Sequence, residues 1–156
     1  MIHIFQYFMG VIMLVAYISP EPAAAQTLSE CDDWRSSVLG IAEPWEANTK
    51  TFTEGTVRMV IMDVGEPVVG SFRLMILTPP TADNPDARQC KVMSLDADLG
   101  FAGLSFDSVT DSTDPTGLTV RIPARRWIAE TDTYNDAVLS VTLNATDGAI
   151  AASFDN

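Results

Sequence analysis

The sequence predicts a mainly β fold: a small antiparallel β-sandwich or barrel of about seven strands, with one short N-terminal helix. Three observations support this prediction. Short runs after residue 50 alternate apolar and polar side chains, as strands with one buried face do. Clusters of Gly, Pro, Asp and Ser separate these runs, as in small all-β domains. A helical period is confined to one stretch near residue 30.

The first 25 residues have the pattern of a signal peptide. An apolar run over residues 2–18 is followed by Ala23-Ala24-Ala25, and signal peptidase reads small residues at such positions. We expect cleavage before Gln26 and a single secreted β-rich domain over residues 26–156. The run lacks a preceding Lys or Arg and almost reaches the length of a bilayer span. The alternative interpretation is therefore that the segment is retained as a membrane anchor. Both interpretations predict a periplasmic or secreted domain.

A short helix is expected over residues 30–39. Ser29 and Asp32 have the spacing of a capping box, and Gly40 is a natural C-terminal stop. On such a helix, positions i, i+3 and i+7 share one face, which we expect to be buried. Those positions hold Cys31, Trp34 and Val38.

The sequence contains two cysteines, Cys31 and Cys90. In an exported chain two cysteines most simply pair, and two alone cannot complete a tetrahedral zinc site. Glu30 directly before Cys31 argues against a lipidated cysteine. We therefore predict a Cys31–Cys90 disulfide that fixes the N-terminal helix to the sheet, with two buried reduced thiols as the alternative.

Seven strands are expected in the rest of the chain. They are residues 55–63, 68–77, 90–95, 101–106, 118–122, 139–143 and 150–154. The polar segments 78–89 and 107–117 have no apolar periodicity and are expected to be loops. Pro123 cannot donate to a ladder, so its strand is expected to lie at an edge or to bulge there. The strand arginines are expected to point outward and to pair with acidic side chains; they are Arg58, Arg73 and Arg121.

The chain is acidic, with a formal net charge of −12. Coulomb repulsion of phosphates excludes nucleic acid as a partner, and it disfavours anionic membrane surfaces once the signal has been removed. The same repulsion between copies favours a monomer.

Several catalytic chemistries are excluded because the single histidine, His3, precedes residue 26. Residues 26–156 therefore cannot form a Ser-His-Asp or Cys-His nucleophile or a histidine-ligated metal site. We expect no cofactor and no metal centre. Two possibilities stay open: a pair of carboxylates could hydrolyse a glycoside, and the acidic segments 96–98 and 107–114 could bind calcium.

The stretch Arg125-Arg126-Trp127 stands out from the acidic background. Arg and Trp are enriched at binding hot spots, so we predict that these residues contact an anionic or aromatic partner. The structural alternative is a cation–π contact or a half-buried Trp at a strand end.

The expected function is binding. The sequence predicts a small, exported, non-catalytic binding or envelope-accessory protein whose partner is an unknown protein or small ligand. Two alternatives remain: a carboxylate-based hydrolase acting on envelope polysaccharide, and a membrane-anchored structural protein with an uncleaved N-terminal segment.

Overall fold

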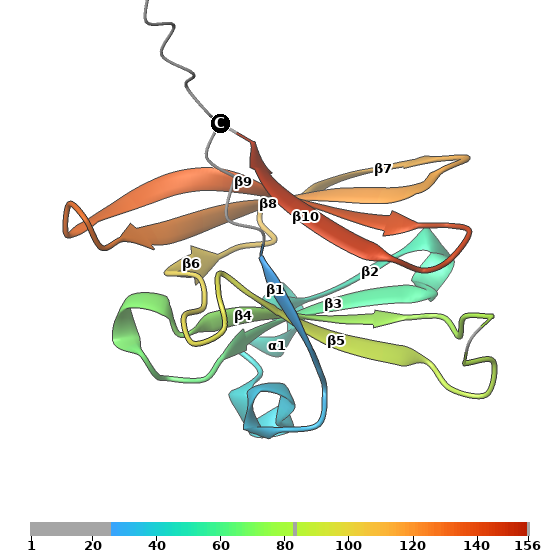
Figure 1. The fold of residues 1–156 in the computed structure, drawn as a ribbon, viewed down its shortest axis with the longest axis horizontal. Coiled ribbons are helices and arrows are strands. Elements are labelled where there is room, and N and C mark those ends of the chain that lie inside the picture. The colour runs from blue at the N-terminus through green and yellow to red at the C-terminus, as the bar shows by residue number, and fades with distance from the viewer. Residues whose placement is uncertain (1–25, 83, 156) are drawn as a thin grey trace, which may run out of the picture.

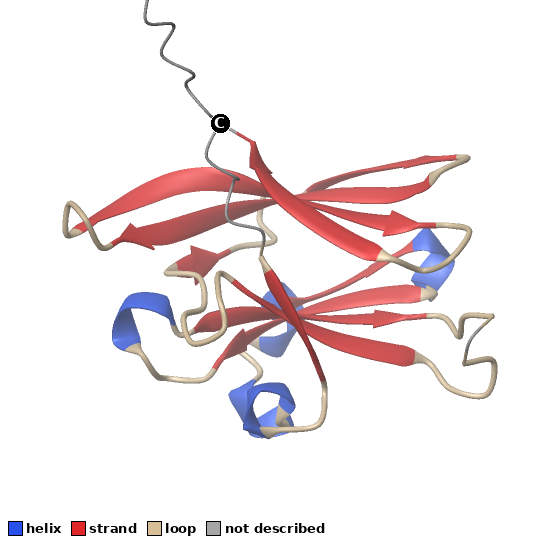
Figure 2. Cartoon of the chain, viewed as in Figure 1, coloured by secondary structure: helices blue, strands red, loops and turns tan. Residues whose placement is uncertain are grey.

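The computed structural model describes residues 26–82 and 84–155, so the expected signal segment lies outside the described residues. The described chain forms two antiparallel five-stranded sheets that face each other across one core (Figures 1 and 2). This arrangement confirms the predicted mainly β, antiparallel class. No helix in the described part is long and apolar enough to cross a membrane.

The first sheet has the strand order β1-β5-β4-β3-β2. Its strands are β1 (Thr27–Glu30), β2 (Thr49–Phe52), β3 (Val57–Asp63), β4 (Phe72–Thr78) and β5 (Gln89–Ser94). The second sheet has the order β10-β9-β8-β6, and β7 also pairs with β8. Its strands are β6 (Gly103–Leu104), β7 (Thr110–Asp114), β8 (Gly117–Ile128), β9 (Thr133–Asn144) and β10 (Ile150–Asp155). The helical elements are α1 (Trp45–Asn48), η1 (Trp34–Ser36), η2 (Val38–Gly40), η3 (Thr53–Gly55) and η4 (Val68–Gly70).

The main core lies between the sheets and is built by the alternation seen in the sequence. Every second residue of the central strands points inward, because successive side chains of a strand leave on opposite faces. The first sheet contributes Val57, Met59, Ile61, Leu74, Ile76 and Met93, and the second contributes Leu118, Val120, Ile122, Leu139, Val141 and Leu143.

The described chain has ten strands where about seven were expected. The additional ones are β1, β2 and β7, and β8 and β9 are longer than predicted. All five residues of β7 are exposed, so no apolar alternation marks this segment as a strand. A hairpin turn forms it instead: Asp114 Oδ1 accepts hydrogen bonds from the backbone nitrogens of Thr116 and Gly117 at 2.7 and 3.2 Å.

The expected edge position of Pro123 is wrong. β8 pairs with β9 along its whole length and with β6 and β7 on its other side. The Pro123 carbonyl accepts a 3.1 Å hydrogen bond from the Ser105 nitrogen, so the backbone nitrogen of Pro123 also points away from β9. On the side away from β9, β6 pairs with residues 124–125 and β7 pairs with residues 117–121. Pro123 lies between these two ranges, so the sheet requires no backbone N–H donor at this position.

The predicted helix over residues 30–39 is also wrong. Glu30 ends β1, and the following residues form the short η1 and η2. The β1–β5 ladder includes Glu30, the first residue of the predicted helix, and Asp33 caps the separate η1 by accepting from the Arg35 nitrogen at 2.9 Å. Trp34 and Val38 are 60% and 68% exposed, so they do not share a buried face with Cys31.

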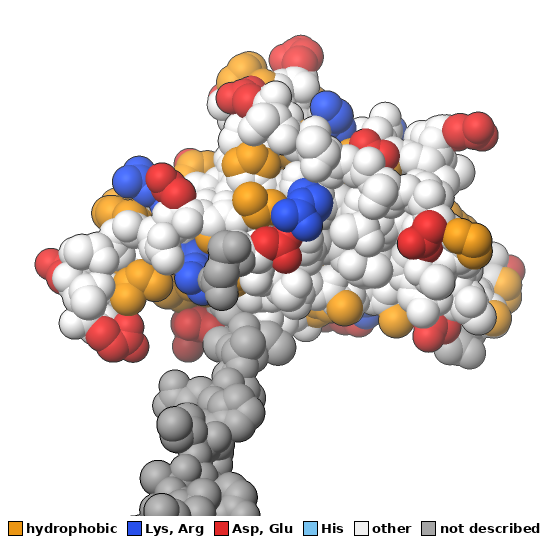
Figure 3. Space-filling model, turned by 90° about the horizontal axis from the view of Figure 1, so that it is seen from above, with side chains coloured by type: hydrophobic (Ala, Val, Ile, Leu, Met, Phe, Trp, Pro, Cys, Tyr) orange, Lys and Arg blue, Asp and Glu red, His pale blue; other side chains and the backbone are white. Residues whose placement is uncertain are grey.

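Figure 3 shows the molecule from above, so the face toward the viewer is the outer face of the second sheet. Its charged side chains are scattered, and the basic ones lie close to acidic ones. Arg121 on β8 pairs as expected, with its Nη1 2.7 Å from Asp155 Oδ2. The acidity of the chain therefore does not concentrate into one patch on this face.

The predicted disulfide is confirmed. Cys31 and Cys90 are bonded, with Cα atoms 5.5 Å apart and a sequence separation of 59. The bond holds residues 31–41 across the outer face of the first sheet, where Val60, Met62 and Met75 form a second buried cluster. The first sheet is thus apolar on both faces, and the segment 31–41, called here the strap, covers part of its outer face.

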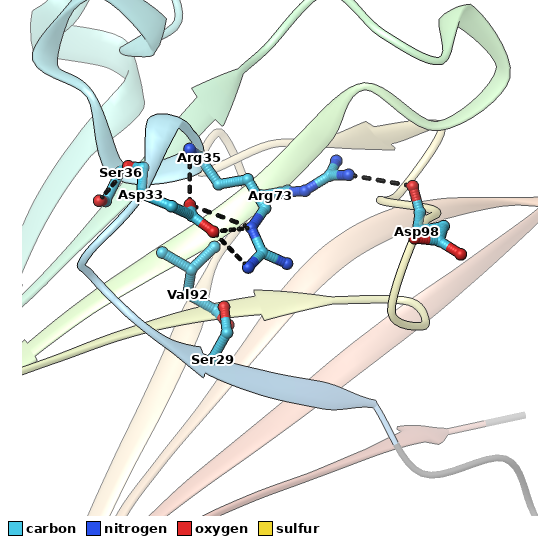
Figure 4. A network of polar contacts seen from close by, with 7 residues as sticks. All are labelled: Ser29, Asp33, Arg35, Ser36, Arg73, Val92 and Asp98. Atoms are coloured by element: carbon cyan, nitrogen blue, oxygen red, sulfur yellow. Dashed lines mark hydrogen bonds and ion pairs between the residues drawn. The ribbon is translucent and has the colours of Figure 1, made fainter.

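Arg73 was expected to face solvent, but it is only 1% exposed. It points to the outer face of the first sheet, where Trp34 lies 5.9 Å from its guanidinium carbon. Its Nη1 donates to Gly70 O at 3.3 Å. Its Nη2 donates to Asp98 O at 3.2 Å (Figure 4). Burial lowers the pKa of Arg73. Carbonyl groups therefore solvate this cation, and no described carboxylate forms an ion pair with it.

Replacing Cys90 with serine should lower the free energy of unfolding by roughly 2–5 kcal/mol, because the unfolded chain regains the freedom of a long loop. Cys31→Ser and the double variant should be destabilised by a similar amount, since all three lose the same bond. Urea denaturation monitored by tryptophan fluorescence measures this. Two free thiols in protein purified without reductant would contradict the linkage.

Gly100→Ala should lower the free energy of unfolding by roughly 1–3 kcal/mol. A Cβ at this position would collide with Phe72 O and Arg73 Nη1. Gly103→Ala is the matched control, since the nearest atom to its Cβ, on Arg125, lies 3.5 Å away. The control should stay within about 0.5 kcal/mol of the wild type. Equal stability of the two variants in thermal denaturation would refute the tight approach at Gly100.

Candidate functional site

The β8–β9 hairpin extends beyond its neighbours in the second sheet. In the described chain, β6 pairs with β8 only through residue 125, and β10 pairs with β9 only from residue 138 onward. Beyond its pairings with β6 and β10, the β8–β9 hairpin is a two-stranded ribbon that reaches one end of the molecule (Figure 1). Residues 125–136 of this ribbon are called here the β8–β9 arm.

All three residues of the predicted contact, Arg125, Arg126 and Trp127, lie on the arm, but they do not share a face. Strand alternation sends Arg125 and Trp127 to the outer face and Arg126 toward the core. The two arginines therefore do not form one positive spot.

The outer face of the arm carries a cluster of four side chains. Trp127 and Tyr134 are cross-strand partners, and their ring centroids lie 5.0 Å apart at an interplanar angle of 59°. The Arg125 guanidinium lies 5.0 Å from the Tyr134 ring, and its Nε is 3.4 Å from Asp136 Oδ1. Tyr134 remains 46% exposed. Sequence reasoning missed Tyr134 and Asp136, although a hairpin register across the turn would have placed them opposite Trp127 and Arg125.

Arg126 has a structural position. Its guanidinium carbon lies 4.5 Å from the Phe154 ring, which itself meets the core residue Phe101 edge-on at 6.1 Å. The Nε of Arg126 is buried and has no hydrogen-bond partner among the described residues. Arg126 thus covers the edge of the main core, as the cation–π alternative predicted for this stretch.

The arm is not electropositive. Glu130, Asp132 and Asp136 lie on it together with Arg125 and Arg126, and all three acids are exposed. At this spacing the potentials of the acids and the arginines largely cancel. The composition of the arm therefore favours an aromatic or apolar contact over an anionic one.

One edge of the arm has open backbone groups. The Pro123 carbonyl points away from β9. Alternate residues of a strand direct their backbone groups to the same side, so the backbone groups of Arg125 and Trp127 also point away from β9. Their cross-strand partners, Asp136 and Tyr134, consequently direct their N–H and C=O groups away from β8. No described strand pairs with β9 at these two positions. A partner strand could therefore add to this edge.

The acidic segments considered for calcium have other roles in the structure. Asp96 Oδ1 accepts from the backbone nitrogens of Asp98 and Leu99 at 2.9 and 2.7 Å, which closes a turn. Asp111 belongs to β7, and Asp114 caps the β7–β8 turn. In the described part of the chain no group of three or more His, Cys, Asp or Glu residues is arranged to hold a metal ion.

A double-mutant cycle should detect the aromatic pair. Trp127→Ala and Tyr134→Ala should couple by about 0.5–1.5 kcal/mol in the free energy of unfolding, beyond the area that each buries. Trp127→Ala combined with Thr142→Ala, near the far end of β9, should be additive within about 0.5 kcal/mol. Urea titrations of the variants measure both quantities. Additivity in the aromatic pair would show that the two rings do not interact.

Compared with protein-family models, with curated proteins and with solved structures, the chain has no significant match. The site must therefore be interpreted from its own geometry, and the structure defines the chain as a disulfide-linked, two-sheet antiparallel β domain with a projecting aromatic arm.

Proposed function

We propose that the chain is an exported, non-catalytic binding protein that engages a protein partner through the outer face of the β8–β9 arm. One observation carries the proposal. Tyr134 contacts both Trp127 and Arg125 on a ribbon that reaches beyond the rest of its sheet. These are the three residue types most enriched at binding hot spots.

The geometry of the cluster favours a protein surface as the partner. The rings are held by cross-strand packing, so little side-chain entropy would be lost on binding. The open edge at Tyr134 and Asp136 offers backbone hydrogen bonds beside the aromatic face, a combination that recognises an extended segment of another chain. The acids of the arm argue against phosphate-rich partners.

Export is supported by two features. The N-terminal 25 residues have the pattern of a signal peptide. The Cys31–Cys90 bond belongs to an oxidising compartment, because cytosolic thiols are kept reduced. A periplasmic or secreted location is therefore part of the proposal. Binding rather than catalysis is supported by the absence of histidine from residues 26–156.

The test compares two outward arginines of β8. Arg125 lies on the arm, whereas Arg121 lies within the sheet; their side chains are 55% and 51% exposed, and each is paired with an Asp. Protein purified from cells expressing the full chain would be immobilised and used to capture partners from a native envelope extract. The dissociation constant of each purified partner would then be measured with Arg125→Glu, Tyr134→Ala and the control Arg121→Glu.

The proposal predicts that Tyr134→Ala weakens binding by about 30-fold or more, as expected for loss of a hot-spot residue. Arg125→Glu should also weaken it, and Arg121→Glu should bind like the wild type. The arm variants should keep their melting temperatures within a few degrees. Unchanged affinity in both arm variants, or equal losses in Arg125→Glu and Arg121→Glu, would overturn the assignment of the arm.

A further inference from the structure

A cavity opens between the two sheets at the opposite end of β8 from the arm. Its volume is about 290 Å³. The walls come from four connections: η3, the β4–β5 connection, the β7–β8 turn and the β9–β10 turn. Figure 1 shows these connections gathered at one end of the molecule. This volume is near the lower limit for small-molecule sites, so the cavity suits a compact ligand.

The floor of the cavity is apolar. Val57, Leu118 and Leu143 line it, and they are 5%, 5% and 6% exposed as part of the main core. A ligand here would therefore contact the end of the hydrophobic core directly. Burial of an apolar part of the ligand against these side chains would stabilise binding.

A buried hydroxyl lies among the lining residues. Thr78 is 4% exposed, and its Oγ1 makes a 3.4 Å hydrogen bond to Pro79 O, which is long for a hydroxyl donor. The oxygen lone pairs receive no hydrogen bond from the described residues. Thr78 thus offers a buried acceptor among the residues that line the cavity.

The rim is polar and acidic. Asp114 and Asp147 line it, and each uses one carboxylate oxygen in its own turn: Asp114 Oδ1 accepts from Thr116 N at 2.7 Å, and Asp147 Oδ1 accepts from Ala149 N at 2.9 Å. Their second oxygens accept no hydrogen bond from the described chain. Hydrogen bonds from Thr116 lower the pKa of Asp114, so this carboxylate is ionised at neutral pH.

No Lys, Arg or His is among the described residues that line the cavity. An anion would meet two carboxylates without a counter-charge, on a chain of net charge −12. A bare metal ion would find too few ligands, because the described residues contain no cluster able to hold one. An organic cation with an apolar body complements both the acidic rim and the apolar floor.

We propose that this cavity binds a small organic ammonium. The apolar body would lie against Val57, Leu118 and Leu143, and the ammonium would donate to Thr78 and to the carboxylates of Asp114 and Asp147. The site is independent of the arm, so the two proposals can fail separately.

The test uses three matched six-carbon probes on the wild-type protein: n-hexylamine, n-hexanol and hexanoate. Calorimetry measures affinity, and NMR chemical shifts locate the site. The amine should bind roughly 10- to 100-fold more tightly than the alcohol, as expected for hydrogen bonds to ionised groups. Hexanoate should not bind. The shifts should fall on residues 53–57, 78–82, 113–118 and 143–148.

Asp114→Asn combined with Asp147→Asn should abolish the preference for the amine, and asparagine keeps the Oδ1 acceptor that each turn needs. Asp107→Asn with Asp111→Asn is the matched control, because it removes the same charge outside the cavity. The control should bind the amine like the wild type. The proposal is overturned if none of the probes binds, if alcohol and amine bind equally, if the shifts lie elsewhere, or if the control loses binding as much as the cavity variant.

Discussion

The buried guanidinium of Arg73 is the constraint on which the first sheet depends. A cation at 1% exposure loses its water shell, and backbone carbonyls of Gly70 and Asp98 replace it at Nη1 and Nη2, while Nε has no hydrogen-bond partner among the described residues. Those carbonyls come from two separate connections, and Trp34 of the strap closes the third side. One side chain thus fixes three segments that are distant in sequence. The close approach at Gly100 follows from the same packing, because a larger residue would displace the guanidinium.

The parts of the fold visible in the sequence are those governed by local alternation and by covalent chemistry. Runs such as residues 118–122 show which face is buried, and two cysteines in a chain with an export pattern predict their own pairing. The errors arise where tertiary pairing overrides a local pattern. Residues 30–39 carry a helix-capping pattern, yet Thr27–Glu30 pair with β5 and take the chain away from a helix. β7 is held by its turn and its pairing with β8, although its side chains are all exposed.

The candidate site likewise has one part that the sequence indicates and another that only the strand register determines. Composition identified Arg125, Arg126 and Trp127, but only the register of β8 against β9 separates them into an outer pair and an inward arginine. The same register brings in Tyr134 and Asp136, which no local pattern marks. β8 and β9 then join two distinct regions, with the aromatic arm at one end and the acidic cavity at the other. These long strands are thus at once the centre of the second sheet and the connection between its two exposed ends.

The position of the disulfide has a mechanical consequence. Both cysteines are joined to the first sheet, Cys31 directly after β1 and Cys90 within β5, so the bond does not link one sheet to the other. The first sheet is built from residues 27–94 and the second from residues 103–155. Their separation is resisted by apolar packing and by the segment 101–102, whose backbone is hydrogen-bonded to Phe72 of β4 and to Arg125 of β8. Tension applied between the N-terminal strand and the arm would therefore load the interface between the sheets. The shortest covalent path from β1 to β8 passes through the Cys31–Cys90 bond, so this bond would shield residues 32–89 from extension. Under such tension the two layers would part as units, and the first would keep its strap.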